Sequence, residues 1–227
     1  RYMKFESITM ENFMRYKGRN HIEFSCDDVK NVTVVLGDNT VGKTTIAQAF
    51  RWGLYGALMA NGTKSAGDFQ LLNTDILEMM DANSRAKVKV EIAAVDEEKR
   101  YIITRETTYT RAFPKLESRE FQKKCAMRIT ELEDMESYVE VDSNEIETLI
   151  NELFPKNLSH YFLFDGERWN DVSVGGVREN IKESVHILTG LSAYREAKNH
   201  LKDMGSNSVI KKFRSEIKGS GAVYDNL

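Results

Sequence analysis

The stretch "NVTVVLGDNTVGKTT", residues 31–45, carries the pattern that decides the fold. Its first half is a β-branched apolar run ending in glycine, which predicts a buried strand over residues 31–37. Its second half has the spacing G-x-x-x-x-G-K-[ST], with Lys43 and Thr44 after the second glycine. From Lys43 onward the apolar residues follow helical spacing, and Gly56 is the predicted end of that helix. A strand, a glycine loop and a helix in this order are the setting in which such a loop holds phosphate groups.

Each position of the loop has a chemical role. Gly37 and Gly42 allow the backbone to curl so that successive N–H groups point toward phosphate oxygens. The start of the helix adds about half a positive charge, which favours an anion there. Lys43 is expected to reach the β- and γ-phosphates, Thr44 to bind a magnesium ion, and Thr45 to donate to the α-phosphate. The sequence therefore predicts a site for a nucleoside triphosphate and Mg²⁺.

Composition bounds the class of protein. The chain has 227 residues, of which 41% are hydrophobic and 30% charged, so it can bury one core with an appendage. A formal net charge of −3 excludes a uniformly basic nucleic-acid coat but not a local basic stripe. No apolar run approaches the length that crosses a membrane. Cys26 and Cys125 are too few for a disulfide framework, so reduced thiols and a cytoplasmic location are expected.

Alternation of apolar and polar residues predicts several strands. Residues 5–10 and 21–24 are expected to form two short strands at the edge of a sheet. Residues 87–106 predict a hairpin that turns at "DEEK", and residues 61–73 a polar surface loop.

Two helices are predicted in the second half of the chain. Asp142 and Glu145 have the spacing of a capping box, and an amphipathic helix is expected to follow and to end at Pro155. After residue 190 the apolar positions are sparse and charges are frequent, which suits a coiled-coil stem or a partner surface.

The residues around the loop resemble a known family. "KFESITMENFMRYKGRNHIEFS", followed by the loop and "AFRWGLYG", is similar to the N-terminal half of the ATPase head in SMC-like ABC ATPases, over residues 3–56 and more loosely over 142–205. Within that class the likeness is to DndD, a bacterial DNA-sulfur-modification protein, and its antiphage relatives. The resemblance gives Asn39 the place of the loop asparagine. It also implies nucleotide contact for Arg15, although the family often has its arginine one position earlier, where this chain has Met14.

The stretch "LSHYFLFDGERW", residues 158–169, has two interpretations. An apolar strand followed by Asp165 fits a Walker B motif, but Gly166 separates Asp165 from Glu167, and no serine-glycine-glycine turn precedes it. The resemblance instead implies a Q-loop in which Asp165 replaces glutamine as magnesium and water contact. "SVGGVRE", residues 173–179, is similar to a signature motif, but we interpret it as a loop.

The resemblance implies an α/β P-loop NTPase, namely the N-terminal lobe of an ABC-type ATPase head over residues 1–190, with an antiparallel β edge. Residues 191–227 would begin a coiled coil, and the Walker B and signature motifs would lie in a C-terminal half. Lys43 and Asp165 would be catalytic, and two heads would form a homodimer that sandwiches ATP. The dimer would act on DNA in the prokaryotic cytoplasm. Other subunits of a DNA-modification or defence complex are possible partners. Two alternatives stay open, a self-contained small NTPase or kinase with Asp165 as Walker B, and an interaction module that binds ATP without hydrolysis.

Several further residues are weaker candidates for contacts with the nucleotide or with DNA. Arg105 is a candidate contact for the nucleotide base, and His160 adjoins the predicted Q-loop, where a structural role is the simpler interpretation. A rim of basic residues is a candidate DNA contact, although each member lies among acidic residues: Lys87, Lys89, Lys99, Arg100, Lys123, Lys124 and Arg128.

Overall fold

The fold is described from a computed structural model of the chain. It describes residues 3–38, 42–58, 70–112, 117–156, 159 and 163. These residues belong to one compact unit, Arg1–Gly166. The predicted domain boundary at residue 190 and the coiled-coil root over residues 191–227 lie outside the described residues and stay predictions. No helix among the described residues has the length and apolar character needed to span a membrane.

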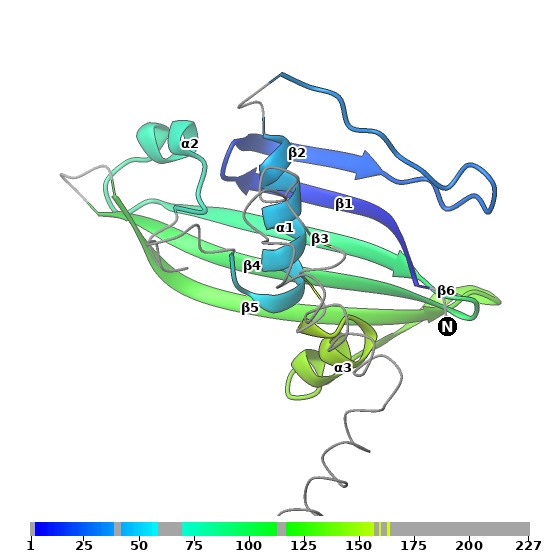
Figure 1. Ribbon diagram of the computed structural model, residues 1–227. Helices are drawn as coiled ribbons and strands as arrows, with labels where there is room; N and C mark the ends of the chain where they lie inside the picture. Colours follow the sequence, from blue (N-terminus) through cyan, green and yellow to red (C-terminus); the bar gives the residue numbers. More distant parts are fainter. Residues whose placement is uncertain are drawn as a thin grey trace, which may run out of the picture. The chain divides into compact units, whose positions relative to one another are not determined.

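The centre of the unit is a six-stranded sheet in which every neighbouring pair is antiparallel (Figure 1). The strand order is β2-β1-β3-β4-β5-β6. Strand β2 lies on one side of the central β1–β3 pair, and β4, β5 and β6 follow in chain order on the other side. The strands are β1 (Lys4–Phe13), β2 (Tyr16–Glu23), β3 (Arg85–Val95), β4 (Lys99–Ala112), β5 (Glu117–Glu131) and β6 (Asp134–Glu140).

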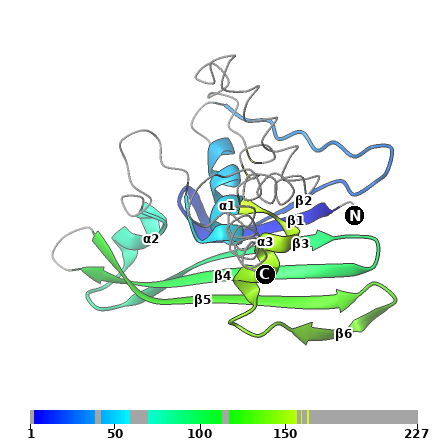
Figure 2. The ribbon, with the colours of Figure 1, turned by 60° about the horizontal axis from the view of Figure 1, so that its bottom comes forward.

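Three helices accompany the sheet: α1 (Lys43–Tyr55), α2 (Thr74–Met79) and α3 (Ile146–Leu153). Helix α1 lies across the middle of one face of the sheet and contacts β1, β3 and β4 (Figure 2). The core forms where Phe50 and Leu54 of α1 meet the buried face of these strands. Phe5 of β1 joins the layers, because its ring packs 4.8 Å from that of Phe50 and stacks 5.2 Å from that of Phe154.

Several predicted elements are confirmed. The hairpin of β3 and β4 turns at the expected residues, where the Asp96 carboxylate accepts the backbone N–H groups of Glu98 and Lys99 at 2.9 and 2.7 Å. The first two predicted strands are β1 and β2, but only β2 is an edge strand, because β1 pairs with both β2 and β3. Helix α1 ends as predicted at Gly56, which adopts φ 64° and donates its N–H to the Trp52 carbonyl.

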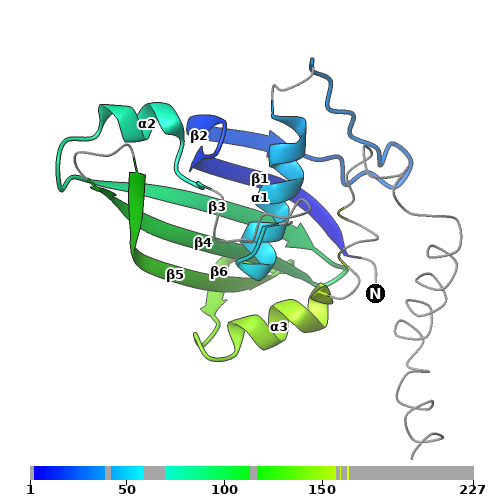
Figure 3. The same cartoon turned by 60° about the vertical axis from the view of Figure 1, so that its left-hand side comes forward.

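The predicted strand over residues 31–37 is wrong. These residues have no regular secondary structure, and Figure 3 shows the segment as an irregular coil leading toward α1. Val34 is 70% exposed and Leu36 is 88% exposed. The physical reason is that strand propensity needs a neighbouring strand to pair with. No described strand pairs with this segment.

The predicted start of the helix after Asp142 also needs correction. The capping box does not form, because Asp142 Oδ1 accepts the Asn144 N–H at 2.9 Å in a turn that precedes α3. The helix does end before Pro155, as predicted.

The predicted surface loop over residues 61–73 is wrong at its end. Leu71 and Leu72 are buried, and Leu72 forms a β-bridge with Phe13. Their two apolar side chains enter the core beside α2, which the sequence analysis did not predict. Strands β5 and β6 were not predicted either.

Candidate functional site

The start of α1 has the geometry of an anion site. Gly42 precedes the helix with φ 110°, a conformation that favours glycine, and its carbonyl accepts the first helical bond from Ile46 N–H at 3.3 Å. No side chain caps this end, and the first turn contains no acidic residue. The N–H groups and the positive end of the helix dipole are therefore directed at a ligand position without a competing carboxylate.

Lys43 lies at the opening of the phosphate loop. Its side chain is exposed, and its ammonium group donates to the carbonyls of Gly37 and Asp38 at 2.5 and 2.6 Å. The lysine thus joins the two ends of the loop, with its charge at the point where the motif requires contact with phosphate. Asn39, the predicted loop asparagine, lies outside the described residues.

The two threonines after Lys43 differ in exposure. Thr44 is exposed, so its hydroxyl is open to a ligand, whereas Thr45 is buried. An exposed hydroxyl oxygen at this position fits Mg²⁺, which prefers oxygen ligands. Among the described residues no group of three His, Cys, Asp or Glu side chains is arranged to hold a metal ion. Asp165, the other predicted metal contact, lies outside the described part of the chain.

The turn between β1 and β2 packs against the loop. Tyr16 donates its hydroxyl to the Gly42 carbonyl at 3.3 Å, and a Cβ on Gly42 would lie 3.4 Å from the Tyr16 ring. Burial raises the pKa of the Tyr16 hydroxyl, which keeps it protonated as a donor. Arg15, the turn residue before Tyr16, is exposed, and its contact with the nucleotide stays a prediction. Tyr16 was not predicted as a loop contact, although an aromatic residue that follows "NF" and a basic residue was the available signal in the sequence.

Asn12, from the same "NF" pair, holds this turn in place. It adopts φ 52°, accepts the Gly18 N–H at 3.0 Å and donates its amide to the Lys87 carbonyl at 3.0 Å. Asn73 adds a second anchor, because its amide donates to the Met14 carbonyl at 2.7 Å. These amides connect the turn to β3 and to the start of α2, so the turn has a fixed position beside the loop.

Arg51 is a further residue that the sequence analysis missed. It lies on α1 with its guanidinium buried against Ser159 and Leu163, more than 100 residues away in the chain. No local pattern announces such a contact. His160, a weak candidate in the same segment, lies outside the described residues.

Arg105 does not lie near the phosphate loop. It contacts the opposite end of α1, where its guanidinium donates to the carbonyls of Gly53 and Leu54 at 3.2 and 3.1 Å. Because α1 has 13 residues, the two ends are about 20 Å apart. The candidate role of Arg105 at the nucleotide base therefore finds no support in its position.

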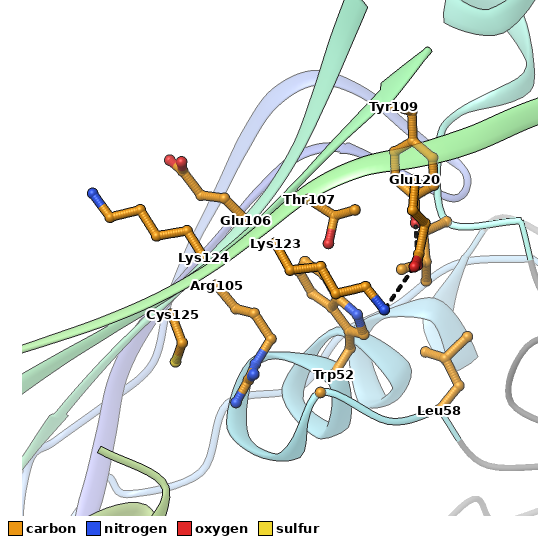
Figure 4. A pocket seen from close by; sticks show the side chains of 12 residues that line it. Trp52, Leu58, Arg105, Glu106, Thr107, Tyr109, Glu120, Lys123, Lys124 and Cys125 are labelled. Carbon is orange, nitrogen blue, oxygen red and sulfur yellow. Dashed lines mark hydrogen bonds and ion pairs between the residues drawn. The ribbon is translucent and has the colours of Figure 1, made fainter. Parts of the chain in front are cut away.

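A pocket of about 490 Å³ opens beside Arg105, between the end of α1 and strands β4 and β5 (Figure 4). Two of its charged side chains pair with each other, since Lys123 Nζ lies 2.7 Å from the Glu120 carboxylate. Burial raises the pKa of the Cys125 thiol, which makes it a poor nucleophile. The pocket thus lies at the end of α1 that is opposite the phosphate loop.

The candidate DNA rim is mostly paired with acidic residues. Six of its seven members have carboxylate partners within 2.5–3.4 Å: Lys87, Lys89, Lys99, Arg100, Lys123 and Arg128. Paired charges on a surface attract phosphates weakly, so these side chains offer little of the field that DNA binding requires.

The comparisons with known proteins agree with the phosphate loop. A family model described as "AAA domain" matches residues 7–218, which is most of the chain. The chain belongs to this AAA-domain family. No curated protein matches it. The match supports an ATPase of the SMC-like kind, but does not separate DndD from other members.

The family and the fold together describe an α/β P-loop ATPase head. In this AAA-domain ATPase, the phosphate loop lies between an irregular segment and α1, and an antiparallel sheet supports α1 from one side. Gly37, Gly42, Lys43 and Thr44 are brought together at one end of that helix. These four predicted residues thus lie together, and their contact with a nucleotide stays a prediction.

Proposed function

We propose that this AAA-domain ATPase is the N-terminal lobe of an SMC-like ATPase head that binds ATP with Mg²⁺ and dimerises on ATP. The observation that carries the proposal is Lys43, whose ammonium bridges the Gly37 and Asp38 carbonyls at an uncapped helix start. In this role Lys43 holds the β- and γ-phosphates and Thr44 binds Mg²⁺. The predicted donation from Thr45 to the α-phosphate requires its buried hydroxyl to become accessible to the nucleotide. Mg²⁺ neutralises charge on the phosphates. Asp165 would supply a carboxylate oxygen to the ion, and Arg15 an exposed cation near the loop.

The exposed segment before the phosphate loop supports the proposal that the complete head contains further strands, which would pair with this segment. Its apolar side chains include Val32, Val34 and Leu36, all strongly exposed. An apolar run of this kind is typical of a strand buried on both faces of a parallel sheet. We propose that strands from a C-terminal half of the polypeptide pair with it, and that this half brings the signature motif and Walker B.

Action on DNA and a setting like that of DndD, in modification or antiphage defence, are the finer part of the proposal. They rest on the resemblance over residues 3–56, because most of the basic rim is ion-paired. DNA binding to the ATP-bound dimer should weaken as salt rises, because phosphate contacts release counterions. A flat salt dependence would contradict DNA contact through basic side chains.

Nucleotide binding is the direct test. A fluorescent ATP analogue should bind the full chain in the presence of Mg²⁺, and Lys43→Ala should lose that binding while keeping its far-UV circular dichroism. Lys30→Ala, at an exposed lysine before the loop, is the matched control and should bind like the unaltered chain. Unchanged affinity in Lys43→Ala would disprove the site.

Turnover separates the proposal from a self-contained NTPase. Steady-state hydrolysis should be slow in the monomer, and sedimentation with a non-hydrolysable ATP analogue should detect a dimer of the complete head. Fast turnover by monomeric chain would instead favour a self-contained enzyme with Asp165 as Walker B. ATP binding without any hydrolysis, even with DNA present, would favour an interaction module.

A further inference from the structure

The pocket between the end of α1 and strands β4 and β5 has the size of a small-molecule site (Figure 4). Its volume of about 490 Å³ falls within the range of about 300–1,000 Å³ that is typical of such sites. Trp52, Leu58 and Leu71 line it with apolar surface, and all three are buried. Strands β4 and β5 supply its polar side chains. The pocket therefore combines an apolar surface with a few polar groups, as sites for small organic molecules do.

Two buried polar groups that line this pocket have no partner in the described part of the chain. Thr107 is 2% exposed and Trp52 is 4% exposed. Neither the Thr107 hydroxyl nor the Trp52 indole N–H forms a hydrogen bond with a described residue. Figure 4 shows the Thr107 hydroxyl directed from β4 toward the Trp52 indole. Because buried polar groups in native proteins are nearly always hydrogen-bonded, these two donors indicate that the pocket accommodates a ligand with acceptor atoms.

The charged groups of the pocket favour an acceptor that is negatively charged. The Glu120 carboxylate already has two donors, the Lys123 ammonium at 2.7 Å and the Tyr109 hydroxyl at 3.5 Å. An ammonium group has three N–H bonds, so Lys123, whose side chain is exposed at the mouth of the pocket, can donate to a further acceptor. The guanidinium of Arg105 is paired with Glu147 at 2.8 Å, so selection for an anion depends on Lys123.

We propose that this pocket binds a small organic carboxylate with an apolar body. The apolar body packs against Trp52, Leu58 and Leu71. The carboxylate accepts hydrogen bonds from the Thr107 hydroxyl, the Trp52 indole N–H and the Lys123 ammonium, and the charge on both partners strengthens the bond from Lys123. The ligand binds at the opposite end of α1 from the phosphate loop, so this site is separate from the proposed nucleotide site.

The indole N–H of Trp52 reports directly on binding. The chain has two tryptophans, Trp52 and Trp169, so Trp169→Phe in the full chain leaves one indole signal in a proton–nitrogen NMR spectrum. The probes are cinnamate, cinnamamide and cinnamylamine, which share one apolar body and differ in their polar group. We expect cinnamate to move the Trp52 proton signal downfield and to saturate below about 10 mM, as suits a ligand of this size. Cinnamamide should bind about tenfold more weakly, because it lacks the charge, and cinnamylamine should not bind.

Substitutions on β4 and β5 test which groups hold the carboxylate. Thr107→Val removes the hydroxyl at nearly constant volume and should weaken cinnamate about fivefold, whereas Thr107→Ser should bind like the unaltered chain. Lys123→Met should weaken cinnamate about tenfold. Lys124→Met is the matched control and should change nothing. Lys123 is opposite Thr107 and Lys124 is opposite Glu106 in the strand register, so the two lysine side chains point to opposite faces of the sheet.

Several outcomes would overturn the proposal. A pocket that holds only water would give no saturable shift with cinnamate. Equal shifts with all three probes would show binding to apolar surface without recognition of a carboxylate. Equal losses in Lys123→Met and Lys124→Met would assign the effect to surface charge. Lys123 is exposed, so its variant is expected to fold and keeps the test decisive even if Thr107→Val does not fold.

Discussion

At the scale of the residue, Gly53 decides how closely α1 approaches the sheet. It lies in the helix interior, where glycine costs about 1 kcal/mol relative to alanine, so its presence needs a packing reason. A Cβ at this position would lie 2.6 Å from Ile92 Cδ1 and 3.0 Å from Val90 Cγ1 on β3. The missing side chain lets the helix that carries the phosphate loop settle against the centre of the sheet.

Gly53→Ala should therefore destabilise the chain despite its better helix propensity. Overpacking of a buried contact costs about 1–3 kcal/mol, against a gain of about 1 kcal/mol in propensity. We expect the free energy of unfolding, measured by urea denaturation, to fall by up to about 2 kcal/mol.

A double variant tests the cause. Ile92→Val removes the Cδ1 methyl group nearest to the new Cβ and alone should cost about 0.5–1.5 kcal/mol. In the double variant with Gly53→Ala, the loss should be smaller than the sum of the two single losses, because the clash is relieved. Additive losses would show that contact with the Ile92 side chain is not what makes alanine unfavourable at position 53.

At the scale of the element, β4 stabilises the ends of two helices. Arg105 donates to carbonyls at the end of α1 and Arg111 to carbonyls at the end of α2, and their spacing of six residues puts both on one face of the strand. Cations at helix C-termini satisfy unpaired carbonyls and oppose the negative end of the dipole. One strand thus fixes the orientation of both helices on the sheet.

The contacts of Arg105 with the end of α1 and with Glu147 should contribute unequally to stability. Its side chain is 14% exposed and bonds Gly53 and Leu54, whereas Glu147, its ion-pair partner on α3 at 2.8 Å, is 60% exposed. Arg105→Met should lower the free energy of unfolding by about 1.5–3 kcal/mol, because charged hydrogen bonds to buried carbonyls are lost. Glu147→Gln should cost under about 1 kcal/mol, because water screens the pair. Equal losses in urea denaturation would show that the ion pair, not the helix end, is the stabilising contact.

The elements also show where sequence patterns suffice. The β3–β4 hairpin was predictable because alternation and a four-residue turn are local, and the end of α1 because Gly56 adopts a left-handed conformation there. The absence of the capping box was not predictable, because Asp142 Oδ1 instead accepts the N–H of the nearby Asn144. Competition among short-range hydrogen bonds is settled by geometry that residue spacing does not contain.

At the scale of the whole molecule, the described sheet is complete without the segment before the phosphate loop. All six strands pair in one antiparallel sheet, and residues 31–38 take no place in it. The apolar run that precedes Gly37 is consequently a mismatch between side-chain chemistry and environment, because Val32, Val34 and Leu36 are 75%, 70% and 88% exposed.

Val34→Asp tests this arrangement. Because Val34 is 70% exposed, the substitution should change the free energy of unfolding of this chain by less than about 0.5 kcal/mol. Val90→Asp, on the fully buried face of β3, is the comparison and should cost several kcal/mol or prevent folding. Urea denaturation measures both. A loss of more than about 2 kcal/mol for Val34→Asp would show that the segment is a buried strand in this chain, as its sequence alone predicts.

The sequence by itself determined the phosphate loop, the helix after it and the first hairpins. These features depend on glycine conformation, helix periodicity and strand alternation, which act within a few residues. Only the tertiary structure decided that residues 31–37 stay unpaired, that Arg105 holds the far end of α1, and that Tyr16 and Arg51 support the loop and the segment before Asp165. Strand pairing and the burial of a guanidinium require partners distant in the chain, such as Arg51 and Leu163, so no local pattern encodes them.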